Sequence, residues 1–111
     1  MPVIDKATFE ELKQMSGADF INELIEAFLE DAPKMLGQMQ AALATRDVES
    51  FRRNAHSLKS NANTFGAVEL AALAKELESM ARENNLDIEN RLELLNAAYG
   101  KAAQELKGMR V

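Results

Sequence analysis

The chain has 111 residues, no cysteine, one histidine and a formal net charge of −5. This length predicts one domain, residues 1–111, and the lack of cysteine excludes disulfides, thiol catalysis and cysteine-based zinc sites. The acidic balance argues against nucleic acid as a partner, because duplex binding is dominated by phosphate neutralisation with Lys and Arg.

Membrane insertion is not expected either. No apolar run approaches the roughly 18 residues needed to cross a bilayer, and the N-terminus lacks the basic and then apolar pattern of a signal peptide. We therefore expect a cytoplasmic protein with no membrane partner.

The first predicted helix is short. Its apolar residues Phe9, Leu12 and Met15 recur at every third position, and either Asp5 or Thr8 is placed to cap its start. We expect this helix to close one end of the fold.

A longer helix is predicted next, with Ser16 and Asp19 as a capping pair. Pro33 interrupts it and allows either a kinked continuous helix or a break with Asp31 capping a second piece. We favour the kinked helix. The inward face is predicted to comprise Ile21, Leu24, Ile25, Phe28, Ala32, Met39 and Leu43.

The third predicted helix carries the histidine. Asp47 is expected to cap it, and Gly66 to end it, because glycine accepts the positive φ of a helix C-terminus. At about 100° per residue, one line along the helix forms the core face, and His56 lies well away from it. His56 is therefore predicted to be exposed. The core face comprises Phe51, Ala55, Leu58, Ala62 and Phe65.

Two more amphipathic helices complete the chain. The first is expected to stop at Asn84-Asn85, and Asp87 to cap the second. Long helices joined by short loops predict an all-α fold, an up-down-up-down antiparallel four-helix bundle with a short extra N-terminal helix. The two apolar faces are Leu70, Leu73, Ala74, Leu77, Met80 and Ala81, then Leu92, Leu95, Tyr99, Ala102, Leu106 and Met109.

His56 is the strongest candidate for chemistry. A neutral imidazole is a nucleophile toward phosphorus near neutral pH, because its unperturbed pKa of about 6.5 leaves a large free-base fraction. Lys59 lies one turn away on the same face, where an ammonium can compensate the charge of a phosphoryl group. Ser60 is small and leaves the ring open to a partner. The surrounding polar surface, a candidate docking area, comprises Arg52, Arg53, Ser60 and Asn63.

Other chemistry has little support. Paired carboxylates such as Glu30-Asp31 and Glu76-Glu78 could hold a divalent ion, but a di-iron bundle needs Glu-x-x-His motifs on facing helices. We therefore predict no metal site and no cofactor. No Gly-rich phosphate loop is present, so autonomous kinase activity is not expected.

The segment around His56 resembles the histidine-containing phosphotransfer (HPt) domain family. The matching residues are Ala55-His56, Leu58-Lys59 and Gly66, and the likeness extends upstream to 28–33 and downstream to 70–78. Many family members carry Gly after the Lys, where this chain has Ser60. We regard that departure as minor.

The resemblance implies a monomeric phosphorelay intermediate, not an enzyme. His56 would accept a phosphoryl group from an aspartyl phosphate on a receiver domain and pass it to another receiver aspartate, with Lys59 stabilising its charge. The implied partners are response-regulator receiver domains and a hybrid sensor histidine kinase, and the Mg²⁺ would belong to the receiver.

Two other interpretations stay open from the sequence. The first is a helical-bundle docking scaffold or inhibitor in which His56 is incidental. The second is a homo-oligomeric structural protein, which would need a large exposed apolar stripe and a solution mass well above 12.3 kDa. Substitution of His56 separates a carrier from a scaffold.

Overall fold

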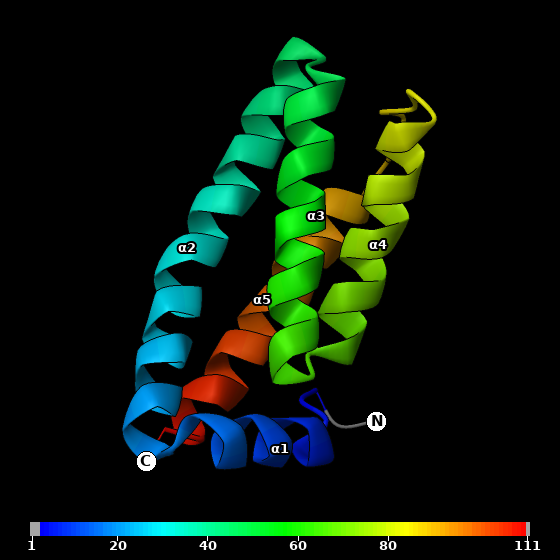
Figure 1. Cartoon of the computed structure of the whole chain (residues 1–111). Coiled ribbons are helices and arrows are strands. Elements are labelled where there is room, and N and C mark those ends of the chain that lie inside the picture. Colours follow the sequence, from blue (N-terminus) through cyan, green and yellow to red (C-terminus); the bar gives the residue numbers. More distant parts are fainter. Residues whose placement is uncertain (1–2, 111) are drawn as a thin grey trace.

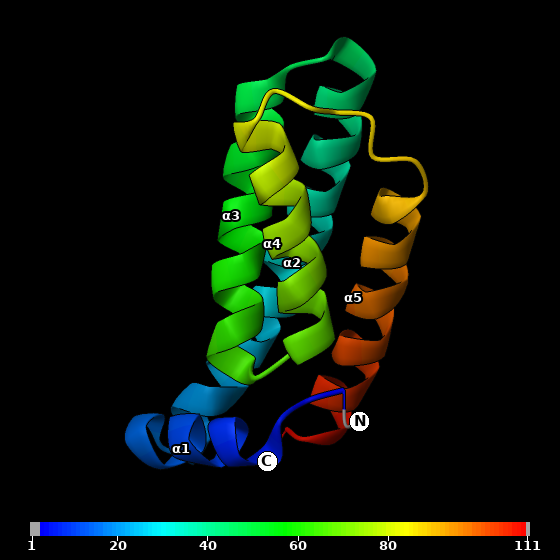
Figure 2. The same ribbon diagram turned by 90° about the vertical axis from the view of Figure 1, so that its right-hand side faces the viewer.

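The computed structural model describes residues 3–110, and these residues form five α-helices and no strand. Helices α2 to α5 run up, down, up and down as a bundle, and α1 lies across one end (Figures 1 and 2). The predicted all-α bundle with an extra N-terminal helix is confirmed. The helices are α1 (Lys6–Ser16), α2 (Ala18–Thr45), α3 (Val48–Phe65), α4 (Val68–Arg82) and α5 (Arg91–Gly108).

Both predicted ends of α3 are confirmed. The Asp47 carboxylate accepts a hydrogen bond from the backbone N–H of Ser50, with 3.1 Å between Oδ1 and N, so one unpaired donor of the first turn is satisfied. Gly66 ends the helix in the left-handed region with φ 78°. These two residues fix the register of the helix that carries His56.

The corner after α3 also holds the N-terminal segment. The backbone N–H of Asp5 donates to the Gly66 carbonyl at 2.8 Å. A Cβ at position 66 would lie 2.9 Å from the Asp5 carbonyl oxygen, so only glycine fits this approach without a shift. The start of α1 is thereby tied to the α3–α4 corner.

Helix α2 is continuous through Pro33, so the break considered from the sequence does not occur. Proline has no N–H, so the carbonyl of Leu29 loses its usual partner four residues on. The Tyr99 hydroxyl on α5 donates to that carbonyl, with 3.4 Å between the oxygens. The ring of Tyr99 also packs edge-on against Phe28, with 5.7 Å between centroids. Tyr99 thus links α5 to α2 at the carbonyl that Pro33 leaves without its helical hydrogen bond.

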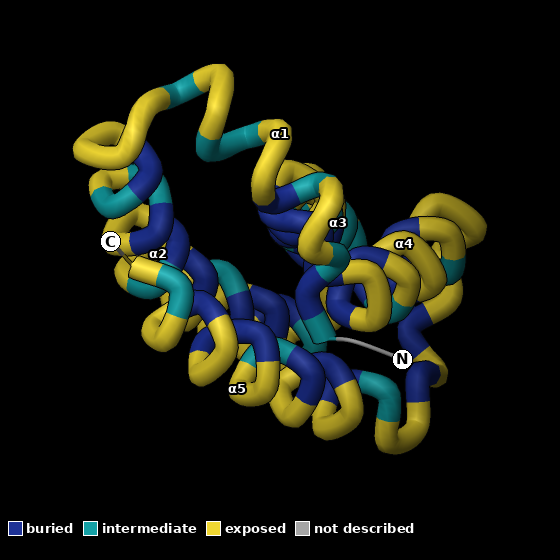
Figure 3. Tube along the Cα trace, turned by 90° about the horizontal axis from the view of Figure 1, so that it is seen from below, coloured by how far each residue is buried: buried dark blue, intermediate teal, exposed yellow. Residues whose placement is uncertain are grey.

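Helix α3 packs against α1, α2 and α4, and α2 and α4 in turn contact α5. Buried residues line the facing sides of the four long helices, and exposed residues cover their outer sides (Figure 3). All five residues of the predicted core face of α3 are buried. The stripe on α2 is largely confirmed, although Leu24 and Leu43 are only half-buried, and Leu36 and Ala42 replace them in the core.

Two predictions near α1 are wrong. Ser16 and Asp19 form no capping pair. The residue before α2 is Gly17, which has φ 86° and no side chain that could cap the helix. Met15 is 86% exposed rather than part of the inward face. The cause is a sharp turn at Gly17 that ends α1 at Ser16 and begins α2 only two residues later.

The predicted start of the last helix is also wrong. Helix α5 begins at Arg91, and Asp87 instead pairs with Arg46, with 3.8 Å between N and O. Leu86 and Ile88 are buried, so the segment before α5 places two apolar side chains in the core. Their burial outweighs the local capping preference of Asp87.

No helix within 3–110 combines the length and apolar character needed to span a bilayer.

Candidate functional site

His56 lies on the outer side of α3, and 55% of its side chain is exposed. Its neighbours Ala55 and Leu58 are buried and anchor the helix in the core. The predicted exposure of His56 is therefore confirmed. The ring is available to a partner, while the backbone of α3 is anchored in the core.

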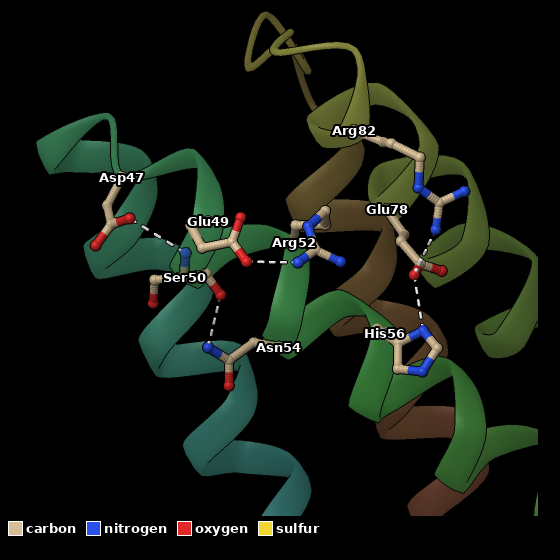
Figure 4. A network of polar contacts seen from close by, with 8 residues as sticks. All are labelled: Asp47, Glu49, Ser50, Arg52, Asn54, His56, Glu78 and Arg82. Carbon is tan, nitrogen blue, oxygen red and sulfur yellow. Dashed lines mark hydrogen bonds and ion pairs between the residues drawn. The ribbon is translucent and has the colours of Figure 1, made fainter.

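A carboxylate from the next helix contacts the ring. Glu78 lies on α4, only 2% of it is exposed, and its Oε2 atom is 2.7 Å from Nδ1 of His56. Figure 4 shows the imidazole and this carboxylate facing each other between the two helices. The contact fixes the orientation of the ring from its Nδ1 side.

Two cations share the same carboxylate. The Lys59 ammonium donates to Oε1 of Glu78 at 2.6 Å, and the Arg82 guanidinium donates to Oε2 at 3.1 Å. Arg82 approaches from one turn further along α4 (Figure 4). Within residues 3–110, no buried side-chain nitrogen or oxygen lacks a hydrogen-bond partner. The buried charge is therefore compensated, as burial requires.

The charge state of Glu78 follows from these contacts. Burial acts to raise the pKa of Glu78, but hydrogen bonds from Lys59 and His56 outweigh it and hold the pKa below its usual value. Glu78 is thus an ionised carboxylate at neutral pH, and such a group only accepts hydrogen bonds.

The tautomer of a neutral His56 follows in turn. Because Oε2 of Glu78 can only accept, Nδ1 carries the proton. The other ring nitrogen, Nε2, then has a free lone pair and no proton. The arrangement presents a nucleophilic nitrogen on a ring of fixed orientation.

The environment of Lys59 differs from the sequence prediction. Helical spacing places Lys59 on the exposed face with His56, but only 23% of its side chain is exposed, because the long chain turns toward α4 to reach Glu78. Lys59 remains within one turn of His56, as predicted. Its ammonium is held by the Glu78 carboxylate.

The other predicted residues lie on the same side of α3 without forming one cluster. The Arg52 guanidinium pairs with Glu49 on its own helix, and Arg53 and Ser60 are exposed. Asn63 is exposed and lines a shallow hollow between α3 and α4. The hollow measures about 240 Å³ and is lined by Lys59, Asn63, Val68, Ala71, Ala72 and Lys75.

Sequence reasoning considered Glu78 only as half of a possible ion-binding pair and missed its contact with His56, and it missed Arg82. A signal was present, because Glu78 lies four residues after Ala74 and three before Ala81, in phase with a buried stripe. A charged residue at such a position indicates a buried carboxylate that needs partners. Arg82 follows one turn later and is one of those partners.

The described residues show no candidate metal centre. Across positions 3–110, no three or more His, Cys, Asp or Glu side chains gather in a way that could hold an ion. Glu76 instead pairs with Arg91, and Glu30 with Lys34. Glu30, Glu76 and Glu78 thus have structural partners.

The chain is similar in sequence to a sensor protein and to a phosphorelay protein. A sequence profile described as the Hpt domain matches residues 23–108. The sensor protein TorS of Escherichia coli (strain K12) is 31% identical over 75 residues, which make up 68% of this chain but 8% of TorS. The phosphorelay protein LuxU of Vibrio harveyi is 27% identical over 84 residues, 76% of this chain and 74% of LuxU.

A solved structure has the same fold. The crystal structure of histidine-containing phosphotransfer protein B (HptB) from Pseudomonas aeruginosa PAO1 matches with a TM-score of 0.88 and 27% sequence identity. The match covers 98% of this chain and 95% of HptB. The chain therefore corresponds to nearly all of HptB, whereas it spans only a small part of the sensor protein TorS.

Proposed function

The chain belongs to the Hpt domain family, and on that premise we propose that it is a phosphorelay intermediate whose phosphoryl acceptor is Nε2 of His56. The observation that carries the proposal is the contact between Nδ1 and the buried Glu78 carboxylate, which in the neutral ring leaves Nε2 unprotonated on a side chain that is 55% exposed. The named relatives support the same role, because LuxU is a phosphorelay protein and HptB is a phosphotransfer protein.

The proposed reaction is a transfer between an aspartate and a histidine. The Nε2 lone pair attacks the phosphorus of an aspartyl phosphate, the P–O bond breaks, and its electron pair returns to the aspartate carboxylate. Glu78 stabilises the positive charge that develops on the ring through the Nδ1–H bond. Lys59 compensates the charge of the incoming phosphoryl group. The reverse sequence delivers the group to a second aspartate.

The partners follow from the same proposal. A receiver domain of a response regulator or of a hybrid sensor kinase would supply the aspartate and the Mg²⁺, and the carrier needs neither a cofactor nor kinase activity of its own. The similarity to the sensor protein TorS supports a link to sensor proteins. We propose that the chain acts as a monomer in the cytoplasm and docks through the exposed side of α3, including Arg52, Arg53, Ser60 and Asn63.

Intact-mass spectrometry tests the proposal. The protein is mixed with a phosphorylated receiver domain and Mg²⁺, and His56→Gln serves as the control. The expected result is one acid-labile phosphoryl group on the wild type and none on the variant. If no member of a panel of receivers transfers a phosphoryl group to the wild type, the carrier role is rejected in favour of a docking scaffold.

A further inference from the structure

We infer that Glu78 keeps the proton on Nδ1 of His56 after phosphorylation, so that the phosphoryl group departs from a neutral imidazole. This inference rests on the proposed function, and it gives Glu78 a part in the outgoing transfer as well as in acceptance. Glu78 is a positioning residue in this reaction, because it contacts the ring and not the phosphorus.

The negatively charged carboxylate of Glu78 lies within hydrogen-bond distance of Nδ1 of His56. Oε2 of Glu78 lies 2.7 Å from Nδ1, and only 2% of Glu78 is exposed, so water competes weakly for this bond. Once Nε2 carries a phosphoryl group, a proton on Nδ1 makes the ring a cation. A carboxylate at hydrogen-bond distance favours that charged form.

The charges of the whole site favour the same protonation state. Before phosphorylation, one carboxylate faces two cations, Lys59 and Arg82, and the neutral ring. A phosphoryl group adds close to two negative charges. With the proton kept on Nδ1, the formal charges of the ring, the phosphoryl group, Glu78, Lys59 and Arg82 cancel. Without the proton, the site holds an excess negative charge.

The other charged groups of α3 and α4 are paired with a partner or exposed to solvent. Arg52 on α3 is close enough to interact with Glu78, but its guanidinium is paired with Glu49. Lys75 on α4 lies beside Lys59 at the shallow hollow and is exposed. Glu76 pairs with Arg91. Glu78 is therefore the one carboxylate that contacts the ring among the residues described, 3–110.

The protonation state decides how easily the P–N bond breaks. In the outgoing step this bond breaks, its electron pair returns to Nε2, and the phosphorus bonds to a carboxylate oxygen of the receiver. If Nδ1 holds its proton, the leaving group is neutral imidazole and no further proton transfer is needed. If Nδ1 is bare, the leaving group is an imidazole anion, which is a much poorer one. Glu78 thus keeps the phosphohistidine in its transferable form.

Glu78→Gln isolates the charge of Glu78 from its shape. The amide oxygen of Gln can still accept the Nδ1–H bond, but it carries no negative charge. Glu76→Gln is the matched control, since it removes a carboxylate two residues away on the same helix that pairs with Arg91 instead of His56. Both variants change the net charge of the protein equally.

The measurement follows the protonation of the phosphorylated ring with pH. Each protein is phosphorylated with phosphoramidate and titrated by ¹⁵N and ³¹P nuclear magnetic resonance, and the rate of phosphohistidine hydrolysis is recorded across the same pH range. We expect the wild type and Glu76→Gln to lose the Nδ1 proton at a pH about one unit or more above Glu78→Gln. The fall in hydrolysis rate should shift by the same amount.

A second comparison uses only the wild type, so it does not require Glu78→Gln to fold. The phosphorylated wild type is titrated in urea as well, and the folded protein should lose the Nδ1 proton at a higher pH than the unfolded one. The inference is overturned if the folded wild type loses the Nδ1 proton at the same pH as the unfolded protein and as a helical Glu78→Gln variant. In that case His56 has still been phosphorylated, so the proposed function stands. A wild type that gains no phosphohistidine from phosphoramidate or from any receiver overturns both.

Discussion

Glu78 lies 22 residues after His56 in the sequence, yet its carboxylate approaches the imidazole to 2.7 Å between Oε2 and Nδ1. The two residues meet because α3 and α4 pack side by side in opposite directions after the tight corner at Gly66. The contact converts a flexible surface histidine into a ring of defined orientation and tautomer. It also brings a buried negative charge to the edge of the proposed phosphoryl site.

Removal of the Glu78 side chain should impair both stability and phosphoryl acceptance. In Glu78→Ala, the Lys59 ammonium and the His56 ring lose their shared acceptor, and a cavity replaces a buried side chain. We expect the free energy of unfolding to fall by about 1–3 kcal/mol, measured by urea denaturation followed by circular dichroism. Acceptance from a phosphorylated receiver should also slow. An unaltered acceptance rate in a folded variant would contradict the orienting role of the carboxylate.

The pH dependence of stability should carry a contribution from Glu78. Its pKa in the folded protein is held below the ordinary value of 4.5, so the folded state binds fewer protons than the unfolded state in the acid range. The contribution is fully present above the unfolded pKa and is lost as pH falls through the folded pKa. The urea midpoint of the wild type should therefore decline more steeply below about pH 4.5 than that of Glu78→Gln. Parallel declines would show that Glu78 titrates alike in both states.

Lys59→Ala should affect chemistry more than folding. The side chain is partly exposed and contributes a charge-assisted hydrogen bond to Glu78 at 2.6 Å. Without it, the incoming phosphoryl group lacks its nearest ammonium, and we expect transfer from a receiver to slow by roughly tenfold or more. Quenched-flow phosphotransfer provides the rate, with circular dichroism confirming the helices. Lys101→Ala is a suitable control, because Lys101 is an exposed lysine on α5 rather than on α3 or α4. Equal rates in wild type and Lys59→Ala would remove Lys59 from the mechanism.

Gly66→Ala should destabilise the corner between α3 and α4. A non-glycine residue in the left-handed region costs about 1–2 kcal/mol, and its Cβ would lie 2.9 Å from the Asp5 carbonyl oxygen. We expect a loss of about 2 kcal/mol or more in the free energy of unfolding. Gly37→Ala offers the control, because nothing lies within 4 Å of a Cβ there. The corner would be less constrained than described if both variants changed stability equally.

The sequence predicted those parts of the fold that depend on local pattern. Helical spacing gave the core face of α3 and the exposure of His56, while Asp47 and Gly66 marked the ends of that helix. The start of α5 was misplaced, since Asp87 is a good local cap and the burial of Leu86 and Ile88 is a long-range effect.

The α4 side of the candidate site, Glu78 and Arg82, could not be predicted from local sequence pattern, because it also depends on long-range packing. His56 and Lys59 share one helix, so their proximity follows from spacing alone. Glu78 joins them only when α3 and α4 pack, and a charged residue in an amphipathic helix is normally assigned to solvent. Its phase with the buried alanines of α4 is the one sequence property that marks it as different.

The contact of Tyr99 on α5 with Phe28 and Leu29 on α2 has a practical consequence. The chain contains one tyrosine and no tryptophan, so Tyr99 is its only strong intrinsic fluorophore. That ring packs against Phe28 and donates to the Leu29 carbonyl, whereas His56 and Glu78 lie between α3 and α4. Tyrosine emission therefore reports on separation of α2 from α5, and an optical melt can follow global unfolding without a label near the phosphoryl site.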